Sequence, residues 1–178
     1  HASNTAELHL DNVRVPAAAL CGERDRGFVN TMQVLEGGRI AMAAMAVGLA
    51  QGALDEALKY MKQRSAFGKT LAEFNGLQGM IAEIGTEVEA ARLLTLRAAA
   101  LKDRGRPART AASMAKVFAS EVAMRAATKA LQIHGGAGYI TEFPIERIFR
   151  DAKLTEIGEG TSEIQRMVIA RDILGMRA

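Results

Sequence analysis

The 178-residue chain carries 23 basic and 20 acidic residues, has a formal net charge of +3 and is 49% hydrophobic. This apolar fraction can fill a substantial core, which argues against a disordered or fibrous chain, and the balanced charge gives no nucleic-acid footprint. Only 4% of the residues are aromatic and three are proline, so long helices are favoured over sheets.

The first segment, "AELHLDNVRVP" (residues 6–16), alternates between apolar and polar residues and ends at Pro16. This alternation is typical of a β-strand, but no second strand pattern follows it. Because a lone strand is only marginally stable, we expect the chain to be cut from something larger.

Three long apolar series follow, each with the 3–4 spacing of an amphipathic helix. They cover about residues 40–64, 77–101 and 114–134. Gly68 is a plausible stop for the first helix, and a "GGAG" segment ends the third. The break between the second and third is "KDRGRPAR" (residues 102–109), which fits a solvated loop better than a phosphate-binding patch because it contains glycine and proline.

A shorter segment, "FPIERIFRDAK" (residues 143–153), leads to a last predicted helix from Ser162 to Leu174. Ser162 and Gln165 have the spacing of a capping box at its start. Gly175 is a natural stop at its end.

Three long amphipathic helices joined by short loops predict an all-α fold, an antiparallel four-helix bundle. The fourth helix is expected either ahead of Ile40 or after Thr161. The alternating N-terminal segment would be a short strand left over from a preceding β domain.

Several other site classes find no support in the sequence. Cys21 is the single cysteine, so no internal disulfide can form. The three histidines, His1, His9 and His134, show no metal-ligand spacing with one another or with Cys21. The apolar stretch of residues 40–58 is interrupted by amide and carboxylate side chains, so it predicts no membrane span.

Three quoted segments stand in order at the ends of successive predicted helices: "QRSAFGKTL" (63–71), "QIHGGAGY" (132–139) and "EGTSEIQR" (159–166). Together they resemble the C-terminal domain of the acyl-CoA dehydrogenases, flavoenzymes that desaturate acyl-CoA thioesters. The N-terminal "TAELHLDNVRVP" is similar to the end of that family's middle β domain. The resemblance therefore implies that residues 1–25 end the β domain and residues 26–178 form the C-terminal helical domain.

By this resemblance, Glu159 is the catalytic base that removes the α-proton of the thioester. Such a carboxylate must swing into a dry cleft, and its flanking glycines suit that movement. In the family, the backbone N–H of the base residue and a flavin ribityl hydroxyl polarise the thioester carbonyl, and the flavin takes the β-hydrogen as hydride. Taken alone, Glu159 would fit a surface carboxylate at the positive end of the following helix; the three aligned segments favour the base.

The resemblance also places Gly158, Gly160 and Arg39 at the substrate. The residue before the base is often Tyr, so Gly158 leaves the expected acyl pocket either wider or filled by another residue. Some relatives carry their base immediately before the residue matching Arg39, and here Gly38 occupies that place.

FAD binding is implied for a second set of residues, namely Arg64, Phe67, Gln132, Gly135, Gly136 and Thr161. Arg64 would reach the FAD pyrophosphate across a subunit interface, a task suited to a fork-shaped cation. Gln132 and the glycine backbone would lie against the adenosine half. The ordinary alternatives are a helix-end cation for Arg64, core packing for Phe67, a helix stop for the glycines and an N-cap for Thr161. Asn75 is a shorter amide where the family usually has Gln, and His134 is assigned no chemistry.

The implied partners are an acyl-CoA substrate, FAD, an electron-transferring flavoprotein and further copies of the chain, in a tetramer built as a dimer of dimers. The expected location is the cytoplasm of a bacterium or the mitochondrial matrix of a eukaryote. Two other functions stay open: a helical binding or oligomerisation module without turnover, and an acyl-CoA oxidase-like flavoenzyme. Glu159 argues against the module, because packing alone gives no reason for a carboxylate there.

Overall fold

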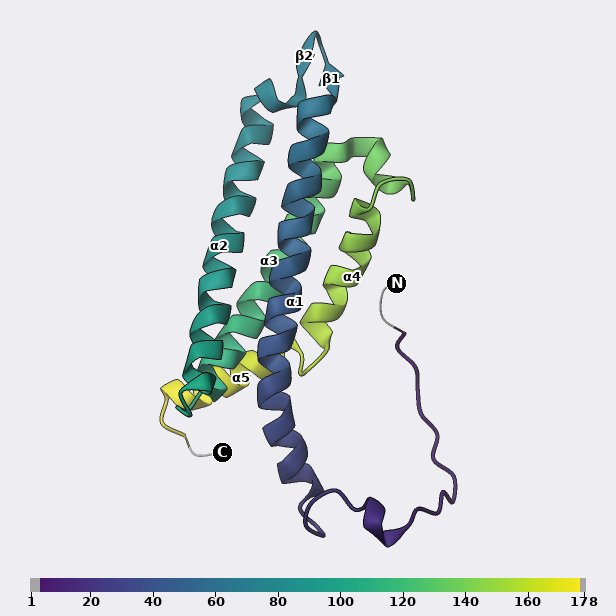
Figure 1. Cartoon of the computed structure of the whole chain (residues 1–178). Coiled ribbons are helices and arrows are strands. Elements are labelled where there is room, and N and C mark those ends of the chain that lie inside the picture. The colour runs from purple at the N-terminus through teal and green to yellow at the C-terminus, as the bar shows by residue number, and fades with distance from the viewer. Residues whose placement is uncertain (1–3, 177–178) are drawn as a thin grey trace.

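Antiparallel helices make up most of the chain, which a computed structural model describes over residues 4–176 (Figure 1). Residues 1–3, which include His1 and begin the predicted end of the β domain, and residues 177–178, which end the predicted helical domain, lie outside this part. The elements in chain order are η1 (Ala17–Ala19), α1 (Gly27–Gln63), β1 (Ser65–Ala66), β2 (Lys69–Thr70), η2 (Leu71–Glu73), α2 (Asn75–Asp103), α3 (Arg109–His134), η3 (Gly135–Tyr139), α4 (Ile145–Ile157) and α5 (Ser162–Ile173). The all-α fold class is confirmed.

The fourth helix of the bundle is α4, so neither expected position for it is right. Helix α3 packs against α1, α2 and α4, and α1 also contacts α2 and α4. The residues before Ile40 are the first turns of α1 itself, while α5 lies at the lower end against α3 (Figure 1). Helix α4 is short, so its periodicity is a weak signal in the sequence, although Ile145, Phe149 and Ala152 give it an apolar face.

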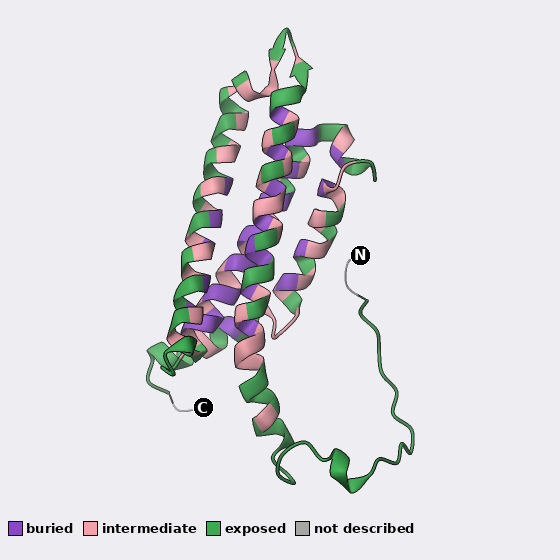
Figure 2. Ribbon diagram, in the orientation of Figure 1, coloured by how far each residue is buried: buried purple, intermediate pink, exposed green. Residues whose placement is uncertain are grey.

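Buried residues line the contact between α1 and α3 (Figure 2), and most of them are alanines. The buried alanines of α1 are Ala43, Ala46, Ala50, Ala53 and Ala57. The distance between packed helices depends on the side chains at the contact, so methyl side chains let the two backbones come close. The larger Leu54 and Leu58, which the periodicity placed in the core, are only partly buried beside this line.

The chain leaves α1 through a tight β-hairpin rather than through a glycine stop at Gly68. Strands β1 and β2 pair antiparallel, and the two-residue loop between them is Phe67–Gly68. Its φ angles are +52° and +81°, the signs that a type I′ turn requires. A positive φ is uncommon for phenylalanine, and the side chain of Phe67 is 96% exposed.

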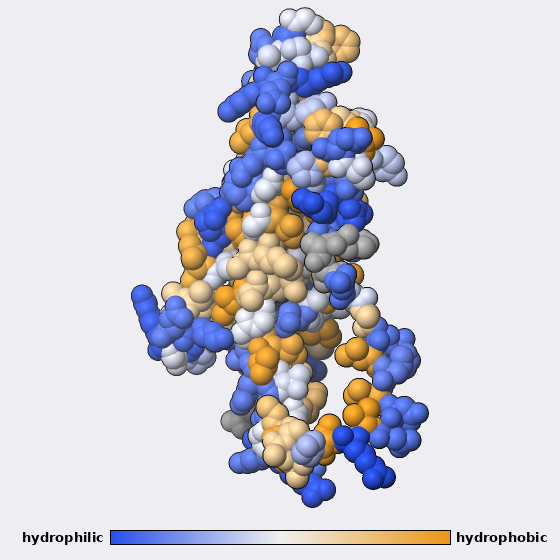
Figure 3. Space-filling model, turned by 45° about the vertical axis from the view of Figure 1, so that its right-hand side comes forward, coloured by the Kyte–Doolittle hydropathy of each residue, from blue (hydrophilic) through white to orange (hydrophobic). Residues whose placement is uncertain are grey.

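The N-terminal segment forms no strand within the described residues, in contrast to the expectation from its alternation. Residues 4–16 run away from the bundle and are exposed (Figures 1 and 2). The hydrogen bonds of a strand are made to a neighbouring strand, and the one pairing formed by residues 4–176 is that of β1 with β2. Apolar side chains remain uncovered along residues 8–20 (Figure 3): Leu8, Leu10, Val13, Val15 and Leu20.

Three further findings concern the described part of the chain. No helix there is both long enough and apolar enough to cross a bilayer. No group of three or more His, Cys, Asp or Glu side chains there is placed to hold a metal ion. Cys21 is exposed.

Candidate active site

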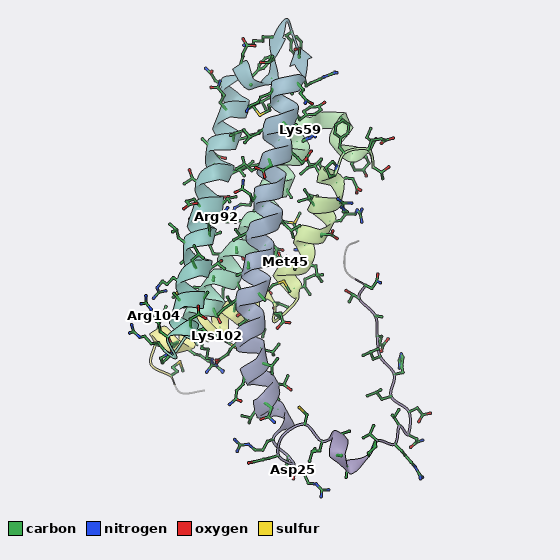
Figure 4. All side chains as sticks on the ribbon, in the orientation of Figure 1. Asp25, Met45, Lys59, Arg92, Lys102 and Arg104 are labelled. Atoms are coloured by element: carbon green, nitrogen blue, oxygen red, sulfur yellow. The ribbon has the colours of Figure 1, made fainter. Side chains whose placement is uncertain are left out.

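The predicted site residues fall into two groups at opposite ends of the bundle. The lower group comprises Arg39, Gly158, Glu159, Gly160 and Thr161, and the upper group comprises Arg64, Phe67, Gln132, Gly135 and Gly136. In Figure 4, Lys102 lies near the lower end and Lys59 near the upper end. At about 1.5 Å per residue, α1 places Arg64 roughly 39 Å from Gly38 at the lower end. The two groups therefore do not meet within one copy of this chain.

Glu159 lies in the loop between α4 and α5, in a backbone conformation that few residues other than glycine adopt. Its φ is +57°, and Gly160 after it has a φ of +91°. Holding a residue in this region costs about 1–3 kcal/mol and persists where the surroundings impose it. The Glu159 carboxylate rests against α1, since a Cβ built on Gly38 would lie 2.2 Å from its Oε2. The space beside Gly38 is thus filled by this carboxylate.

Two fully buried polar side chains bind this loop, Lys116 of α3 and Gln165 of α5. Lys116 Nζ donates to the carbonyl of Glu156 at 3.0 Å and to that of Gly160 at 2.8 Å. Gln165 Nε2 donates to the carbonyls of Glu159 and Gly160, both at 3.0 Å. The strained loop is therefore fixed from two helices at once.

Neither of these two roles was predicted from the sequence. The capping box predicted at Ser162 is wrong, because the N-cap of α5 is Thr161, whose Oγ accepts from the N–H of Ile164 at 3.4 Å. Ser162 is the first residue of α5, and Gln165 turns back to the loop. Lys116 had one detectable signal, a lysine on the alanine-lined face of the third helix.

Arg39 is buried close to the same loop and is 7% exposed. Its Nε and Nη1 have no hydrogen-bond partner within the part of the chain that the structure describes. Burial lowers the pKa of the guanidinium; the charge of Glu36 opposes this, that of Arg109 adds to it, and that of Glu159 opposes it. Because buried donors are normally paired, the free N–H groups of Arg39 make it a candidate to contact a polar ligand beside Glu159.

The space beside Gly158 is taken by Met42 of α1. A Cβ built on Gly158 would lie 2.9 Å from Met42 Cε. Of the two expectations for this position, a wider pocket or one filled by another residue, the contact favours the second. Methionine is flexible and adapts its shape to its neighbours, so the filling side chain can move.

The upper group gathers around a stacked pair of rings. Tyr60 near the end of α1 and His134 at the end of α3 have ring centroids 4.3 Å apart and an interplanar angle of 25°. Arg64 directly follows α1 as its C-cap, and Gly135 ends α3 with a φ of +57°. This contact brings the "QRSAFGKTL" and "QIHGGAGY" segments to the same end of the molecule.

The donors of the upper group are open to solvent. The guanidinium of Arg64 has no hydrogen bond or ion pair with any other described residue, and Gln132 is exposed. A Cβ built on Gly135 or Gly136 would meet nothing within 4 Å. A free fork-shaped cation, an exposed amide and an open glycine backbone fit the pyrophosphate and polar edge of a dinucleotide such as FAD. Because these groups face solvent, they can contact only one side of such a cofactor.

An apolar hollow of about 590 Å³ adjoins the hairpin at this end. Phe67, Phe74, Asn75 and Leu77 are among the residues that line it. Lys69 Nζ lies 4.2 Å from the centroid of the Phe74 ring, close enough for a cation–π contact. The hollow can take an apolar or planar group.

Known proteins show the same domain. Residues 25–174 match the family model described as acyl-CoA dehydrogenase, C-terminal domain. The chain is 54% identical over 172 residues to a probable acyl-CoA dehydrogenase of Bacillus subtilis, covering 97% of this chain and 45% of that protein. It is 50% identical over 172 residues to the cyclohexane-1-carbonyl-CoA dehydrogenase of Geobacter metallireducens, with the same two coverages, 97% and 45%.

A solved structure gives the same result. The butyryl-CoA dehydrogenase from Megasphaera elsdenii superposes with a TM-score of 0.88 at 47% sequence identity, covering 90% of this chain and 42% of that one. The chain therefore spans less than half the length of these relatives.

Proposed function

The chain belongs to the acyl-CoA dehydrogenase family, and we propose that it forms the C-terminal domain of an FAD-dependent enzyme that desaturates an acyl-CoA thioester between its α and β carbons. The observation that carries the proposal is the Glu159 carboxylate, held on a left-handed backbone against Gly38. An ordinary surface carboxylate has no need of a strained backbone or of a buried lysine to hold its loop.

In the proposed reaction, Glu159 accepts the α-proton of the thioester. Its carboxylate is partly buried between the loop and α1, and substrate that displaces the remaining water makes it a stronger base. The N–H of Glu159, held by the same loop, donates to the thioester oxygen, where negative charge develops. Arg39 offers its buried, unpaired N–H groups to a polar part of the substrate beside Glu159. The chemistry that FAD supplies when bound is acceptance of the β-hydrogen as hydride.

The upper group is proposed to bind the FAD of another subunit. Arg64 stands too far from Glu159, roughly 39 Å along α1, for one copy to place both around the same substrate. A symmetric oligomer solves this, because each subunit then supplies the base of one site and the pyrophosphate contacts of another. The proposed assembly is a dimer of dimers, with an electron-transferring flavoprotein as the electron acceptor.

Anaerobic mixing of the complete enzyme with acyl-CoA tests the proposed function directly. We expect the visible absorption of oxidised flavin to bleach as the substrate is desaturated, and the enoyl-CoA product to appear in equal amount. A helical module without turnover would leave the flavin band unchanged.

Gly158 gives a prediction about acyl specificity. In Gly158→Tyr, the new side chain must displace Met42 Cε and narrow the acyl site. We expect kcat/KM for a branched or cyclic acyl-CoA to fall about tenfold more than kcat/KM for butyryl-CoA, since small volume changes in an apolar pocket have effects of this size. Met42→Ala is the opposing control and should favour the bulkier substrates. An equal loss on both substrates would show that position 158 does not shape the pocket.

The isolated chain is expected to be helical, self-associated and colourless. Large apolar side chains are exposed on the bundle and near it, among them Phe28, Val34, Leu93 and Leu96, and such surfaces tend to find partners. FAD would meet mainly the solvent-facing donors of the upper group, which leaves much of the cofactor in water. Circular dichroism, light scattering and the visible spectrum of the purified chain check the three properties. A stoichiometric yellow flavin band or a clean monomer would contradict the expectation.

A further inference from the structure

Lys116 is a charged side chain in the middle of an apolar face. It is 0% exposed, and its neighbours on the buried face of α3 are mostly alanines, including Ala112 and Ala119. A buried ammonium is unfavourable unless it is paired and hydrogen-bonded. An apolar residue would pack there without this difficulty, so the lysine needs a reason beyond packing.

The two acceptors of Lys116 lie on either side of Glu159. The carbonyl of Glu156 belongs to the last turn of α4, where helix geometry leaves carbonyls unpaired and the helix dipole favours a cation. The other acceptor, the carbonyl of Gly160, lies one residue after Glu159. One side chain therefore links the end of α4 to the start of α5 across the strained residue.

Gln165 completes this arrangement from the other side. It donates to the Gly160 carbonyl, as Lys116 does, and also to the carbonyl of Glu159. The fit is close, because a Cβ built on Gly160 would lie 2.7 Å from Gln165 Nε2. With two consecutive carbonyls fixed, the peptide planes after Glu159 have little freedom to turn.

We propose that Lys116 is a positioning residue for Glu159, which fixes the left-handed loop so that the carboxylate and the N–H of Glu159 point to one place. The inference rests on the proposed function of Glu159 as the base. Lys116 makes no contact with the Glu159 carboxylate among its hydrogen bonds to described residues. Its effect on the reaction is exerted through the backbone.

A purely structural role for Lys116, as a cap on α4, predicts something different. Loss of a cap lowers the stability of the fold, and it affects activity only as much as any equal loss of stability elsewhere. A positioning role predicts a selective fall in kcat, with substrate affinity retained, and a selective loosening of the loop. The two roles can be separated by a control substitution on the same helix that lowers the stability of the fold by a similar amount.

The test uses Lys116→Met in the complete, FAD-loaded enzyme. Methionine keeps an unbranched stem and removes the N–H donors. Val122→Ala is the matched control, because Val122 is also fully buried on α3 and makes no side-chain hydrogen bond. We measure three quantities: kcat, the Kd of an alkyl-CoA thioether, which lacks the thioester carbonyl and cannot react, and hydrogen exchange of the amides in residues 157–161.

Lys116→Met is expected to lower kcat by about 10²-fold relative to Val122→Ala. This is the effect expected when a catalytic group is displaced by about 1 Å. The Kd of the thioether should stay within about threefold, and exchange of the 157–161 amides should rise by about tenfold or more as the loop opens. If Lys116→Met fails to fold, Gln165→Leu is the second variant, and it should change kcat and exchange in the same direction.

Two results overturn the proposal. One is a kcat in the variant equal to that of Val122→Ala, with or without faster exchange. The other is a fall in kcat without faster exchange at residues 157–161. Failure of the proposed function gives a different result, since the wild-type enzyme itself would then show no flavin bleaching with acyl-CoA.

Discussion

Replacing Glu159 by glutamine in the complete enzyme is expected to slow flavin reduction by acyl-CoA by about 10²–10⁴-fold, the usual effect of removing a positioned general base. The amide has almost the same shape as the carboxylate, so the loop should keep its place against Gly38. FAD binding should be unchanged, because the cofactor contacts proposed for this chain lie mainly at the opposite end of the bundle. Anaerobic stopped-flow absorbance measures the rate, and the flavin-to-protein ratio measures binding.

Glu163→Gln is the matched control for this experiment. Glu163 is an exposed carboxylate in the first turn of α5, close to Glu159 in sequence. Its replacement should leave the rate of flavin reduction nearly unchanged. Rapid bleaching in Glu159→Gln, or an equal loss in Glu163→Gln, would contradict the assignment of Glu159 as the base.

Gly160→Ala is expected to have the second largest effect. Its φ of +91° disfavours any side chain, and the added Cβ would lie 2.7 Å from Gln165 Nε2. The variant should therefore lose about 1–3 kcal/mol of folding stability through backbone strain. It should also lose about 10²-fold in kcat, because the loop that carries Glu159 must shift. Urea unfolding and steady-state kinetics measure the two effects.

Gly48→Ala controls for the general effect of adding a methyl group. Gly48 lies in α1, and a Cβ there would meet nothing within 4 Å. Because alanine is the better helix former, this variant should be more stable by about 0.5–1 kcal/mol and keep its activity. A Gly160→Ala enzyme with the stability and kcat of wild type would show that the left-handed loop is not required.

Apolar periodicity predicted the three long helices well, because each buries one continuous face over many turns. It failed at the start of α1, where Gly37 and Gly38 lie inside the helix although glycine disfavours helix interiors. The structure supplies a tertiary reason: a Cβ on Gly37 would lie 2.6 Å from Lys102 Nζ, and one on Gly38 would lie 2.2 Å from Glu159 Oε2. Side chains from distant segments occupy this room, which no local pattern can reveal.

In the candidate site, too, features within one segment could be predicted from the sequence, and contacts between distant segments could not. The sequence alone placed Glu159 between two glycines and ahead of a helix, and the structure finds this arrangement. It could not show that Lys116 and Gln165 hold the loop, since their meeting depends on how α3 and α5 pack. Nor could it show that Met42 of α1 lies against Gly158. These contacts are made by residues whose types are ordinary for a helix.

Exchange of the α-hydrogen of acyl-CoA with solvent tests the central claim most directly, because it reports proton abstraction separately from hydride transfer. The complete enzyme is incubated in D₂O, without oxygen or an electron acceptor, with a 3-thia-acyl-CoA that cannot be desaturated. Mass spectrometry then measures deuterium at the α-carbon. The account predicts rapid incorporation by the wild-type enzyme and a rate lower by at least about 10²-fold in Glu159→Gln. Equal incorporation by the two enzymes would contradict it, because the α-proton would then be removed by another group.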